Sequence, residues 1–271
     1  MRLINRKPGR PLAMVLLLLP FLAMLAAYAI GSDIRRAENP QDKLLPAPAA
    51  IVETAGRLLT TPDRRSGDVL FWTDTAISLQ RLAVGVGIAA LIGLLFGLAI
   101  GLLPYMRATF AGFVSVLSMV PPLAILPILF IVFGLGETSK VALIAIGITP
   151  FLIRDLAQRV LEIPAEMVVK AQTLGATSLV IALRVALPQV LPRLIQSVRL
   201  SLGPAWLFLI AAEAIASDAG LGYRIFLVRR YLAMDVILTY VVWITILAFV
   251  IDYALKKLGE RAFPWTGQGG L

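Results

Sequence analysis

The chain has 271 residues, of which 59% are hydrophobic and 15% charged, and its formal net charge is +9. Soluble domains are about half apolar and about a quarter charged, so this composition excludes an ordinary soluble protein and indicates an integral membrane protein. The absence of Cys and His excludes disulfides, thiol redox chemistry, histidine general bases and most zinc or haem sites. Nucleic-acid binding is also disfavoured, because no basic run carries interleaved aromatic residues.

The first predicted element is an apolar helix from Leu12 to Ile30. A membrane core needs about 20 apolar residues per helical span, so this segment is long enough to cross it. A signal peptide is the alternative, because the start of the chain is basic and Ala27-Tyr28-Ala29 resembles a cleavage site. The apolar run exceeds the roughly 7–15 residues usual for a signal peptide, which favours an uncleaved span.

A polar segment follows, and within it Leu44 to Leu59 has the pattern of a short amphipathic helix entered through Pro46 and Pro48. Such a helix is expected to lie on the membrane surface rather than to cross it. Five further spans are predicted, over 76–103, 110–133, 138–156, 194–217 and 236–255.

Six spans place both termini on one side of the membrane. The segments on that side carry fourteen of the 25 Lys and Arg residues and the opposite segments carry ten, which predicts cytoplasmic termini by the positive-inside rule. The fold expected is all-α and polytopic. Its predicted parts are a tail with the first span (1–35), a periplasmic segment (36–75), a core domain (76–258) with a loop at 160–192, and a cytoplasmic tail (259–271).

Small residues recur every four positions along the second predicted span: Gly85, Ala89, Gly93, Gly97 and Gly101. This spacing lines them up on one helix face, where another backbone can approach closely. Packing within one bundle is the favoured interpretation, and a sliding or dimer interface is the alternative.

The third predicted span contains the sequence SMVPPLAILPILF. Proline removes a backbone donor and disturbs the preceding turn, and broken helices at membrane depth often line a pathway. We therefore expect a substrate path or gate here, formed by Met119, Pro121, Pro122 and Pro127.

Ionisable residues inside the spans are few, and Glu213 is the deepest. It could pair with one of the arginines that follow it, contact a substrate in the path, or lie near the outer interface. Arg81 and Asp252 lie nearer to span ends, where long side chains usually reach the interface. Because no chain of acids crosses the membrane, a proton-driven carrier is disfavoured.

Between the fourth and fifth spans, the sequence predicts two helices joined by a glycine turn. Pro164 is placed near the start of the first helix, and Gly175 is placed at its end. Thr177 or Ser178 can cap the second helix, which is expected to run to Leu187-Pro188. The apolar face of this hairpin needs a partner.

This hairpin resembles the EAA loop of binding-protein-dependent ABC importer permeases, whose pattern is E-A-A, three residues, G, nine residues, then I-x-L-P. Gly175, Ala171, Val185 and Leu187-Pro188 match that pattern at the right spacing. Val169 and Lys170 replace the usual glutamate and first alanine, so one polar contact of the family is not expected here. By this resemblance the contacts with an ATPase fall on Val169, Lys170, Ala171, Thr173, Leu174, Gly175, Ala176 and Pro188.

The resemblance extends from Leu44 to about Leu258. The segments SLQRLAVGVGIAALIGLLFGLAIG, VPPLAILPILFIVFGLGETSKVALIAIGI and AEAIASDAGLGYRI are similar to those of nitrate, sulfonate and taurine importer permeases. It implies the type I ABC importer permease fold, with a cytoplasmic coupling helix.

No phosphate-binding loop G-x-x-x-x-G-K-[ST] is present, and residues 134–140 miss it because no glycine directly precedes Lys140. The chain itself is therefore predicted to bind no cofactor and to be no enzyme. The resemblance implies that ATP and Mg are bound by two partner ATPase subunits. It also implies a second permease copy, most simply an identical one, and a periplasmic or lipid-anchored binding protein, all in a bacterial inner membrane.

The function predicted is a permease subunit of an ATP-driven importer for a small anion such as a sulfonate, taurine or nitrate. Arg224, Arg229 and Arg230 are expected on the outer side, where they would meet acidic patches of the binding protein or draw the anion. Because Glu213 is acidic, a neutral or cationic nitrogen compound such as urea or guanidine is the alternative substrate.

Two other classes of function predict different sequence features. A secondary carrier would show internal repeats and intramembrane charges, and a membrane enzyme would show a cluster of acids or a nucleophile with a base. Neither is evident.

Overall fold

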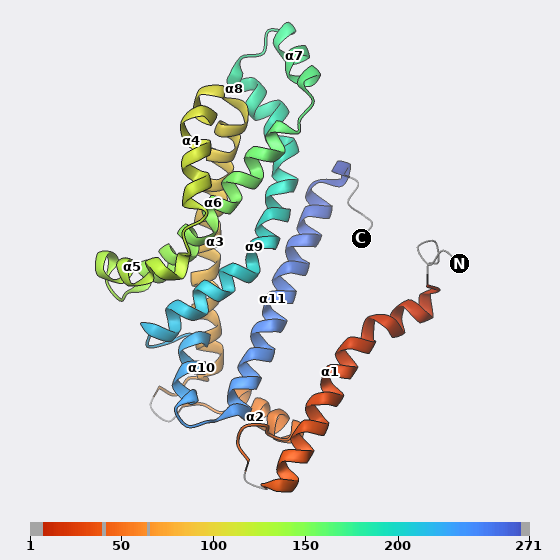
Figure 1. Cartoon of the computed structure of the whole chain (residues 1–271), viewed down its shortest axis with the longest axis vertical. Coiled ribbons are helices and arrows are strands. Elements are labelled where there is room, and N and C mark those ends of the chain that lie inside the picture. Colours follow the sequence, from red (N-terminus) through yellow and green to blue (C-terminus); the bar gives the residue numbers. More distant parts are fainter. Residues whose placement is uncertain (1–7, 40–41, 64–65, 267–271) are drawn as a thin grey trace. The chain divides into compact units, whose positions relative to one another are not determined.

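The structure is a computed structural model that describes residues 8–39, 42–63 and 66–266. Across these residues it contains helices and connecting loops and no β-strand (Figure 1). The chain divides into two compact units. Residues 1–61 and 228–241 form one unit, and residues 62–227 and 242–271 form the other. The basic residues Arg2, Arg6 and Lys7 lie outside the described residues.

The first unit contains α1 (Arg10–Glu38), α2 (Pro48–Thr60) and the beginning of α11 (Met234–Ala262). Polar contacts fix the turn after α1, where the Tyr28 hydroxyl donates to the Pro46 carbonyl at 2.7 Å and the buried Ser32 hydroxyl donates to the Leu45 carbonyl at 3.0 Å. Thr54 of α2 donates to the Asp235 carboxylate at 2.7 Å. The predicted amphipathic helix is therefore present, and it is held just before its first residue and at its middle.

Helix α1 carries its apolar side chains on an exposed surface, with Leu17 66% and Phe21 60% exposed. It is 29 residues long, so it exceeds the length that a membrane core requires. An apolar helix that is exposed on all sides is stable in lipid and not in water. This part of the chain has the character of a membrane span.

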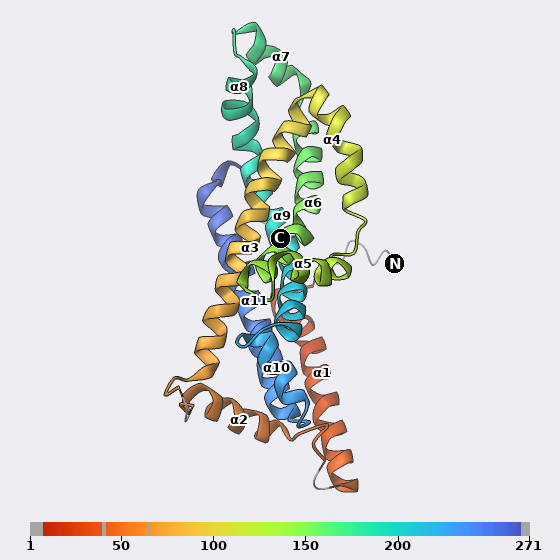
Figure 2. The same cartoon turned by 90° about the vertical axis from the view of Figure 1, so that its left-hand side faces the viewer.

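The second unit is built around the long helices α3 (Leu70–Leu102), α6 (Glu137–Leu161) and α9 (Leu187–Ile215). Shorter elements connect them: α4 (Pro104–Leu117), η2 (Pro122–Ile125), α5 (Leu126–Phe133), α7 (Ala165–Thr173), α8 (Ser178–Ile181), the π-helical segment η3 (Ala182–Ala186), α10 (Leu221–Arg229) and η4 (Pro264–Thr266). Figures 1 and 2 show α7 at one end of this unit and the start of α10 at the other.

The glycine-rich face of α3 packs directly against α6. A Cβ atom added to Gly93 would lie 2.7 Å from the Leu152 Cβ, and one added to Gly101 would lie 2.4 Å from the Val160 Cβ. These distances are shorter than real Cβ contacts, so only glycine permits the observed helix separation. The interpretation of the small residues as a packing face within one bundle is confirmed.

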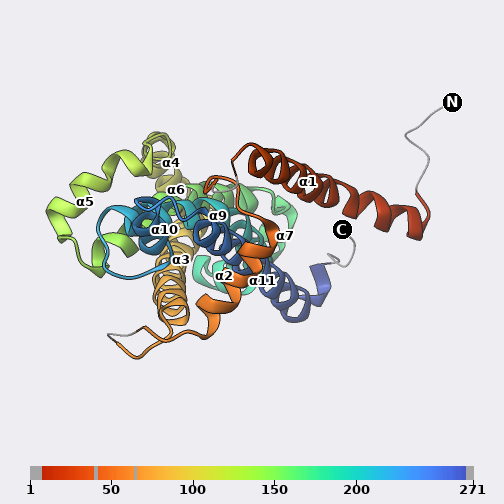
Figure 3. The same ribbon diagram turned by 90° about the horizontal axis from the view of Figure 1, so that it is seen from below.

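The third predicted span is broken. Helix α4 ends at Leu117, and the pair Pro104–Leu117 and Pro122–Phe133 is bent by 83°. Figures 1 and 3 show α5 projecting to the side of the α3–α6 pair. The break expected from the prolines of this span is therefore confirmed, and it falls where Pro121 and Pro122 remove backbone donors.

Five described helices are long and apolar enough to cross a membrane, or six if the bent pair counts as one span. They are α1, α3, α6, the continuous segment Ser178–Ile215, and α11. The all-α, polytopic fold class is confirmed. The fifth span begins sixteen residues earlier than the sequence pattern indicated, because the chain does not leave the helical path at Pro188.

The end predicted for the second helix of the hairpin, at Leu187-Pro188, is accordingly wrong. Residues Ala182–Ala186 form a π-helical segment, and α9 continues directly from it. A proline ring clashes with the carbonyl four residues earlier in an α-helix, and a wider π turn relieves this clash. The Val185 carbonyl also accepts a hydrogen bond from the Gln189 side chain at 2.8 Å.

Candidate functional site

The hairpin of α7 and α8 has the geometry that its sequence predicts. Pro164 precedes α7, and Gly175, which follows the C-cap residue Leu174, adopts φ +80°. The Ala176 N–H donates to the Ala171 carbonyl at 3.0 Å, and the Gly175 N–H donates to the Gln172 carbonyl at 2.9 Å. This pair of bonds is the Schellman motif, which ends a helix at a residue in the left-handed conformation. The glycine of the pattern is therefore required by the backbone.

The start of α8 is capped as expected. The Thr177 hydroxyl accepts a hydrogen bond from the Val180 N–H at 3.4 Å, and Thr177 has the extended conformation of an N-cap residue. The turn between the two helices is thus only four residues long, from Leu174 to Thr177. It holds α7 as a separate short helix at the end of the unit.

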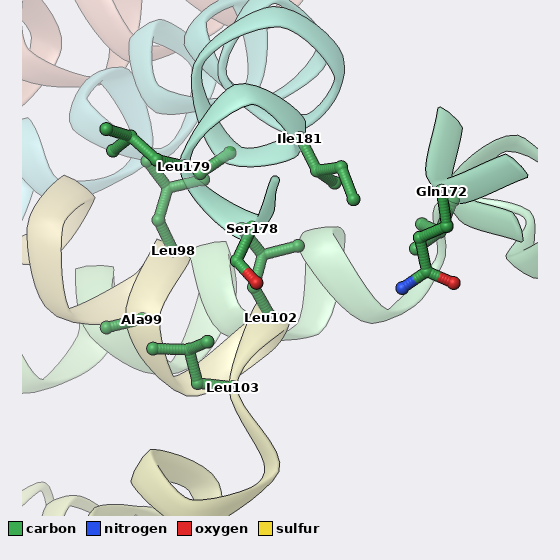
Figure 4. Close-up of a pocket in the computed structure, with 10 residues that line it drawn as sticks. Leu98, Ala99, Leu102, Leu103, Gln172, Ser178, Leu179 and Ile181 are labelled. Carbon is green, nitrogen blue, oxygen red and sulfur yellow. The ribbon is translucent and has the colours of Figure 1, made fainter. Parts of the chain in front are cut away.

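A groove of about 380 Å³ separates the hairpin from the end of α3 (Figure 4). Leu98, Ala99, Leu102 and Leu103 line it from α3, and Val168, Gln172, Ser178, Leu179, Ile181 and Ala182 line it from the hairpin. Helix α7 therefore does not pack tightly on the bundle. It is held mainly through its connections to α6 and α8.

The predicted coupling residues lie mostly on the exposed side of the hairpin. Leu174 is 87% exposed and Val169 is 54% exposed, whereas Val168 and Gln172 face the groove. Lys170, Thr173 and Gly175 are also exposed, and Ala171 and Ala176 are half-buried. Exposed apolar side chains at the tip of a short helix, beyond the candidate spans, indicate a contact with another protein. Pro188 lies apart from this surface, in the first turn of α9.

The predicted path residues lie at the break between α4 and α5. Met119 is 74% exposed, and Pro121 and Pro127 are exposed as well. Pro122 lines a hollow of about 210 Å³ together with residues of α6 and Phe208 of α9. The break is therefore beside a cavity, and Glu213 is not part of it.

Glu213 is fully buried and belongs to an ionic network at the other end of the unit. Its carboxylate accepts hydrogen bonds from Arg81 Nη1 at 2.8 Å, from the Ser78 hydroxyl at 2.7 Å and from the Gly222 N–H at 2.8 Å. Arg81 also pairs with Glu137 at 2.5 Å. The guanidinium of Arg81 is only 5% exposed and joins α3, α6 and α9, so this side chain does not reach outward as expected for a residue near a span end.

A second ion pair fixes the corner between α9 and α10. Buried Asp74 accepts from Arg224 Nε at 2.8 Å and from the Gly220 N–H at 2.8 Å. Arg81 donates to the Ala219 carbonyl at 2.9 Å. Buried charges are tolerated when they are paired and hydrogen-bonded, as these are. The network holds the α9–α10 corner against α3.

The sequence model of the family described as "Binding-protein-dependent transport system inner membrane component" matches residues 88–262. This match covers more than half of the chain. The chain belongs to this family.

Three relatives are similar to this chain over a longer stretch than the residues 88–262 that the family model matches. The chain is 35% identical over 225 residues to the taurine transport system permease protein TauC of Escherichia coli K12, covering 83% of this chain and 81% of that protein. It is 30% identical to the putative aliphatic sulfonates transport permease protein SsuC of the same organism, over 83% of this chain and 82% of that one. The nitrate import permease protein NrtB of Leptolyngbya laminosa is 28% identical, over 80% of this chain and 78% of NrtB.

A solved structure supports the fold. The permease chain in inward-facing conformations of the MetNI methionine ABC transporter superimposes with a TM-score of 0.63 at 22% identity. The match covers 71% of this chain and 95% of that one. This chain is thus a permease of the ABC importer family, as its EAA-like hairpin indicated. ABC permeases are transport subunits rather than enzymes.

The three arginines expected to meet a binding protein differ in their surroundings. Arg224 is 17% exposed and pairs with Asp74, so its charge is largely used within the permease. Arg229 and Arg230 are exposed, and they belong to the unit that contains α1 and α2, at the start of its segment 228–241. Pairing of Glu213 with Arg224, Arg229 or Arg230 is wrong, because its cationic partner is Arg81.

Sequence reasoning missed one residue of the cavity region. Arg154 lies in α6, which continues to Leu161, and the sequence alone indicated no role for it. Arg154 Nη1 donates to the Ser118 hydroxyl at 2.7 Å, next to the break after α4. The spacing of Phe151, Arg154 and Gln158 by three and four residues, which places them on one face of a helix, was the available signal.

Proposed function

We propose that this permease imports a small solute that carries an anionic group, of the sulfonate, taurine or nitrate type. Support comes from the relatives designated as taurine, aliphatic sulfonate and nitrate permeases. The alternative of a neutral or cationic nitrogen compound rested on Glu213. That carboxylate is fully buried and bonded to Arg81, Ser78 and Gly222, so it is not available to a solute.

The observation that carries the proposed mechanism is the exposed apolar tip of the α7 hairpin, with Val169 and Leu174 beside the Gly175 turn. An ATPase subunit grips this tip, and a second ATPase subunit grips the hairpin of a second, identical permease copy. ATP and Mg are bound by the ATPases and not by this chain. Closure of the ATPase pair moves α7 as a rigid body, and the attached α6 and α9 convert this motion into alternating access.

The hairpin and both termini face the cytoplasm in this proposal, in a bacterial inner membrane. The α10 end then faces the binding protein, periplasmic or lipid-anchored, which delivers the solute. Exposed Arg229 and Arg230 suit acidic patches on such a protein.

The test is a Gly175→Val variant in vesicles that contain the complete transporter and binding protein. Valine at φ +80° costs at least about 1 kcal/mol, so the turn is displaced and import per ATP hydrolysed falls by about fivefold or more. Gly67→Val is the matched control, since Gly67 also has a positive φ of 76° and open space around it but lies far along the chain from the hairpin.

Unchanged import per ATP in Gly175→Val would contradict the coupling role. Purification supplies an independent check, because this permease should retain an ATPase subunit in mild detergent. A secondary carrier would be purified without one and would transport alone.

A further inference from the structure

The exposed face of α6 carries a charged residue within a candidate span. Phe151, Arg154 and Gln158 follow one another at intervals of three and four residues, so they share one helix face. Helix α6 ends at Leu161, seven residues after Arg154. With a rise of 1.5 Å per residue, Arg154 lies about 10 Å inside the α7 end of the helix.

Arg154 lines a cleft of about 520 Å³ together with Ser118, Phe151, Asp155 and Gln158. This volume is within the range of about 300–1,000 Å³ that is usual for small-molecule sites. Ser118 and Phe151 also line the apolar hollow of about 210 Å³ at the break between α4 and α5. The polar cleft therefore adjoins the hollow at the proline-broken segment.

The charge of Arg154 is not neutralised within the described part of the chain. Arg81 pairs with two glutamates and Arg199 pairs with Asp252 at 2.8 Å, whereas Arg154 forms no ion pair with any described residue. Its hydrogen-bond partner is the neutral Ser118 hydroxyl, which itself donates to the Ser115 carbonyl. A cation in a span without a countercharge is costly, and such residues normally face a water-filled path or a ligand.

Asp155 also lines the cleft, and its negative charge has to be considered. Its carboxylate accepts a hydrogen bond from buried Ser197, and Arg159 of the same helix lies 3.8 Å from it. Asp155 is therefore engaged with α9 and with the next turn of α6. It does not pair with Arg154.

We propose that Arg154, with Ser118 and Gln158, forms a subsite for the anionic group of the transported solute, a sulfonate or nitrate. This inference rests on the proposed function and adds the residue that selects for negative charge in the membrane path. The guanidinium has five N–H donors in a planar fork, and only one nitrogen is used by Ser118. The amide of Gln158 supplies further donors, and Phe151 supplies an apolar surface for the organic part of a sulfonate.

The experiment compares Arg154→Gln and Arg154→Lys with the wild type in vesicles that contain the complete transporter and its binding protein. Uptake of labelled taurine, ethanesulfonate and nitrate is measured alongside urea and guanidinium. Arg154→Gln should lower anion uptake about tenfold or more, the loss expected for a charge-assisted hydrogen bond. Anion uptake by Arg154→Lys should lie between that of the wild type and that of Arg154→Gln, because lysine keeps the charge and lacks the planar guanidinium.

Arg193→Gln is the matched control. Arg193 is an exposed arginine of α9 whose Nη1 contacts the Gln196 side chain, and it lines none of the cavities described above. Its uptake should equal that of the wild type. ATP hydrolysis stimulated by the loaded binding protein should persist in all three variants, because the coupling hairpin is unchanged.

The outcomes separate this inference from the proposed function. A wild type that imports urea or guanidinium and none of the anions overturns the proposed function. A wild type that imports an anion, with Arg154→Gln importing it equally well, overturns only the subsite.

A lipid phosphate group shares the oxyanion chemistry, so the assay is repeated in vesicles of phosphatidylcholine alone and in vesicles with added phosphatidylglycerol. The same loss of uptake in both lipids supports a solute site. A loss of uptake that occurs only in the vesicles with phosphatidylglycerol contradicts it. A loss of uptake that is explained by a lower melting temperature of the variant contradicts it as well.

Discussion

Arg81 and Arg154 both lie within helices long enough to cross a membrane, and their surroundings differ. Arg81 is 5% exposed and donates hydrogen bonds to two glutamates, a serine and a backbone carbonyl. Each of its three guanidinium nitrogens therefore has a partner within the permease. Arg154 is exposed to a cleft and bonds one serine hydroxyl. A saturated arginine fixes three helices relative to one another, and an open one is available to a solute. The difference lies in the partners and not in the residue type.

The largest expected effect comes from breaking the saturated site. Arg81→Gln leaves buried Glu213 without its cation, and breaking one side of a buried ion pair costs about 3–5 kcal/mol. Arg154→Gln makes the same chemical change in the open cleft and should alter the free energy of unfolding by less than about 0.5 kcal/mol. Thermal unfolding of both variants in one detergent measures the difference. Equal losses of stability would mean that Arg154 is structural as well.

A smaller effect is expected where α6 packs on α3, on the side of α6 that does not carry Arg154. Gly101→Ala places a Cβ 2.4 Å from the Val160 Cβ, and overpacking of this kind costs about 1–3 kcal/mol. Gly87→Ala in the same helix is the control, because nothing lies within 4 Å of its added Cβ. The two melting temperatures should separate. If both variants match the wild type, the close approach of α3 and α6 is not maintained in the membrane.

The smallest effect is expected in the hairpin, which has no network comparable to that of Arg81. Thr177→Ala removes the hydroxyl that accepts from the Val180 N–H at 3.4 Å, and a cap of this length contributes about 0.5 kcal/mol, the low end for caps. Hydrogen exchange of the α8 amides should speed up slightly, with global stability unchanged. Thr109→Ala is the control, since its hydroxyl donates to the Tyr105 carbonyl and caps no helix. Unchanged exchange at α8 would show that the cap is not formed.

Local sequence signals predicted the parts of this permease that depend on local physics. The apolar lengths of the spans, the glycine face of α3 and the turn at Gly175 all follow from interactions between residues close in sequence or on one helix face. The turn of the hairpin was predicted closely, because the glycine that ends α7 and the threonine that caps α8 act through local backbone geometry. The end of the second helix was not.

Prolines marked two irregularities without determining their form. Pro121 and Pro122 coincide with a break of 83°, whereas Pro188 is absorbed by the π-helical segment before it and the helix continues. Both sites lose backbone donors, so the outcome depends on which neighbours donate hydrogen bonds to the freed carbonyls. Sequence alone could place the disturbance and not its size.

Taken by itself, the sequence determined that this is a polytopic helical protein with a short helical hairpin closed by a glycine turn, because composition and helix-terminating residues act over one or two turns. Only the tertiary structure decided that Glu213 belongs to Arg81, 132 residues away, and that Arg154 faces a cleft beside the broken helix. Those pairings depend on which helix faces meet. Charge interactions weaken with distance in space and not along the chain, so residue spacing carries no record of them.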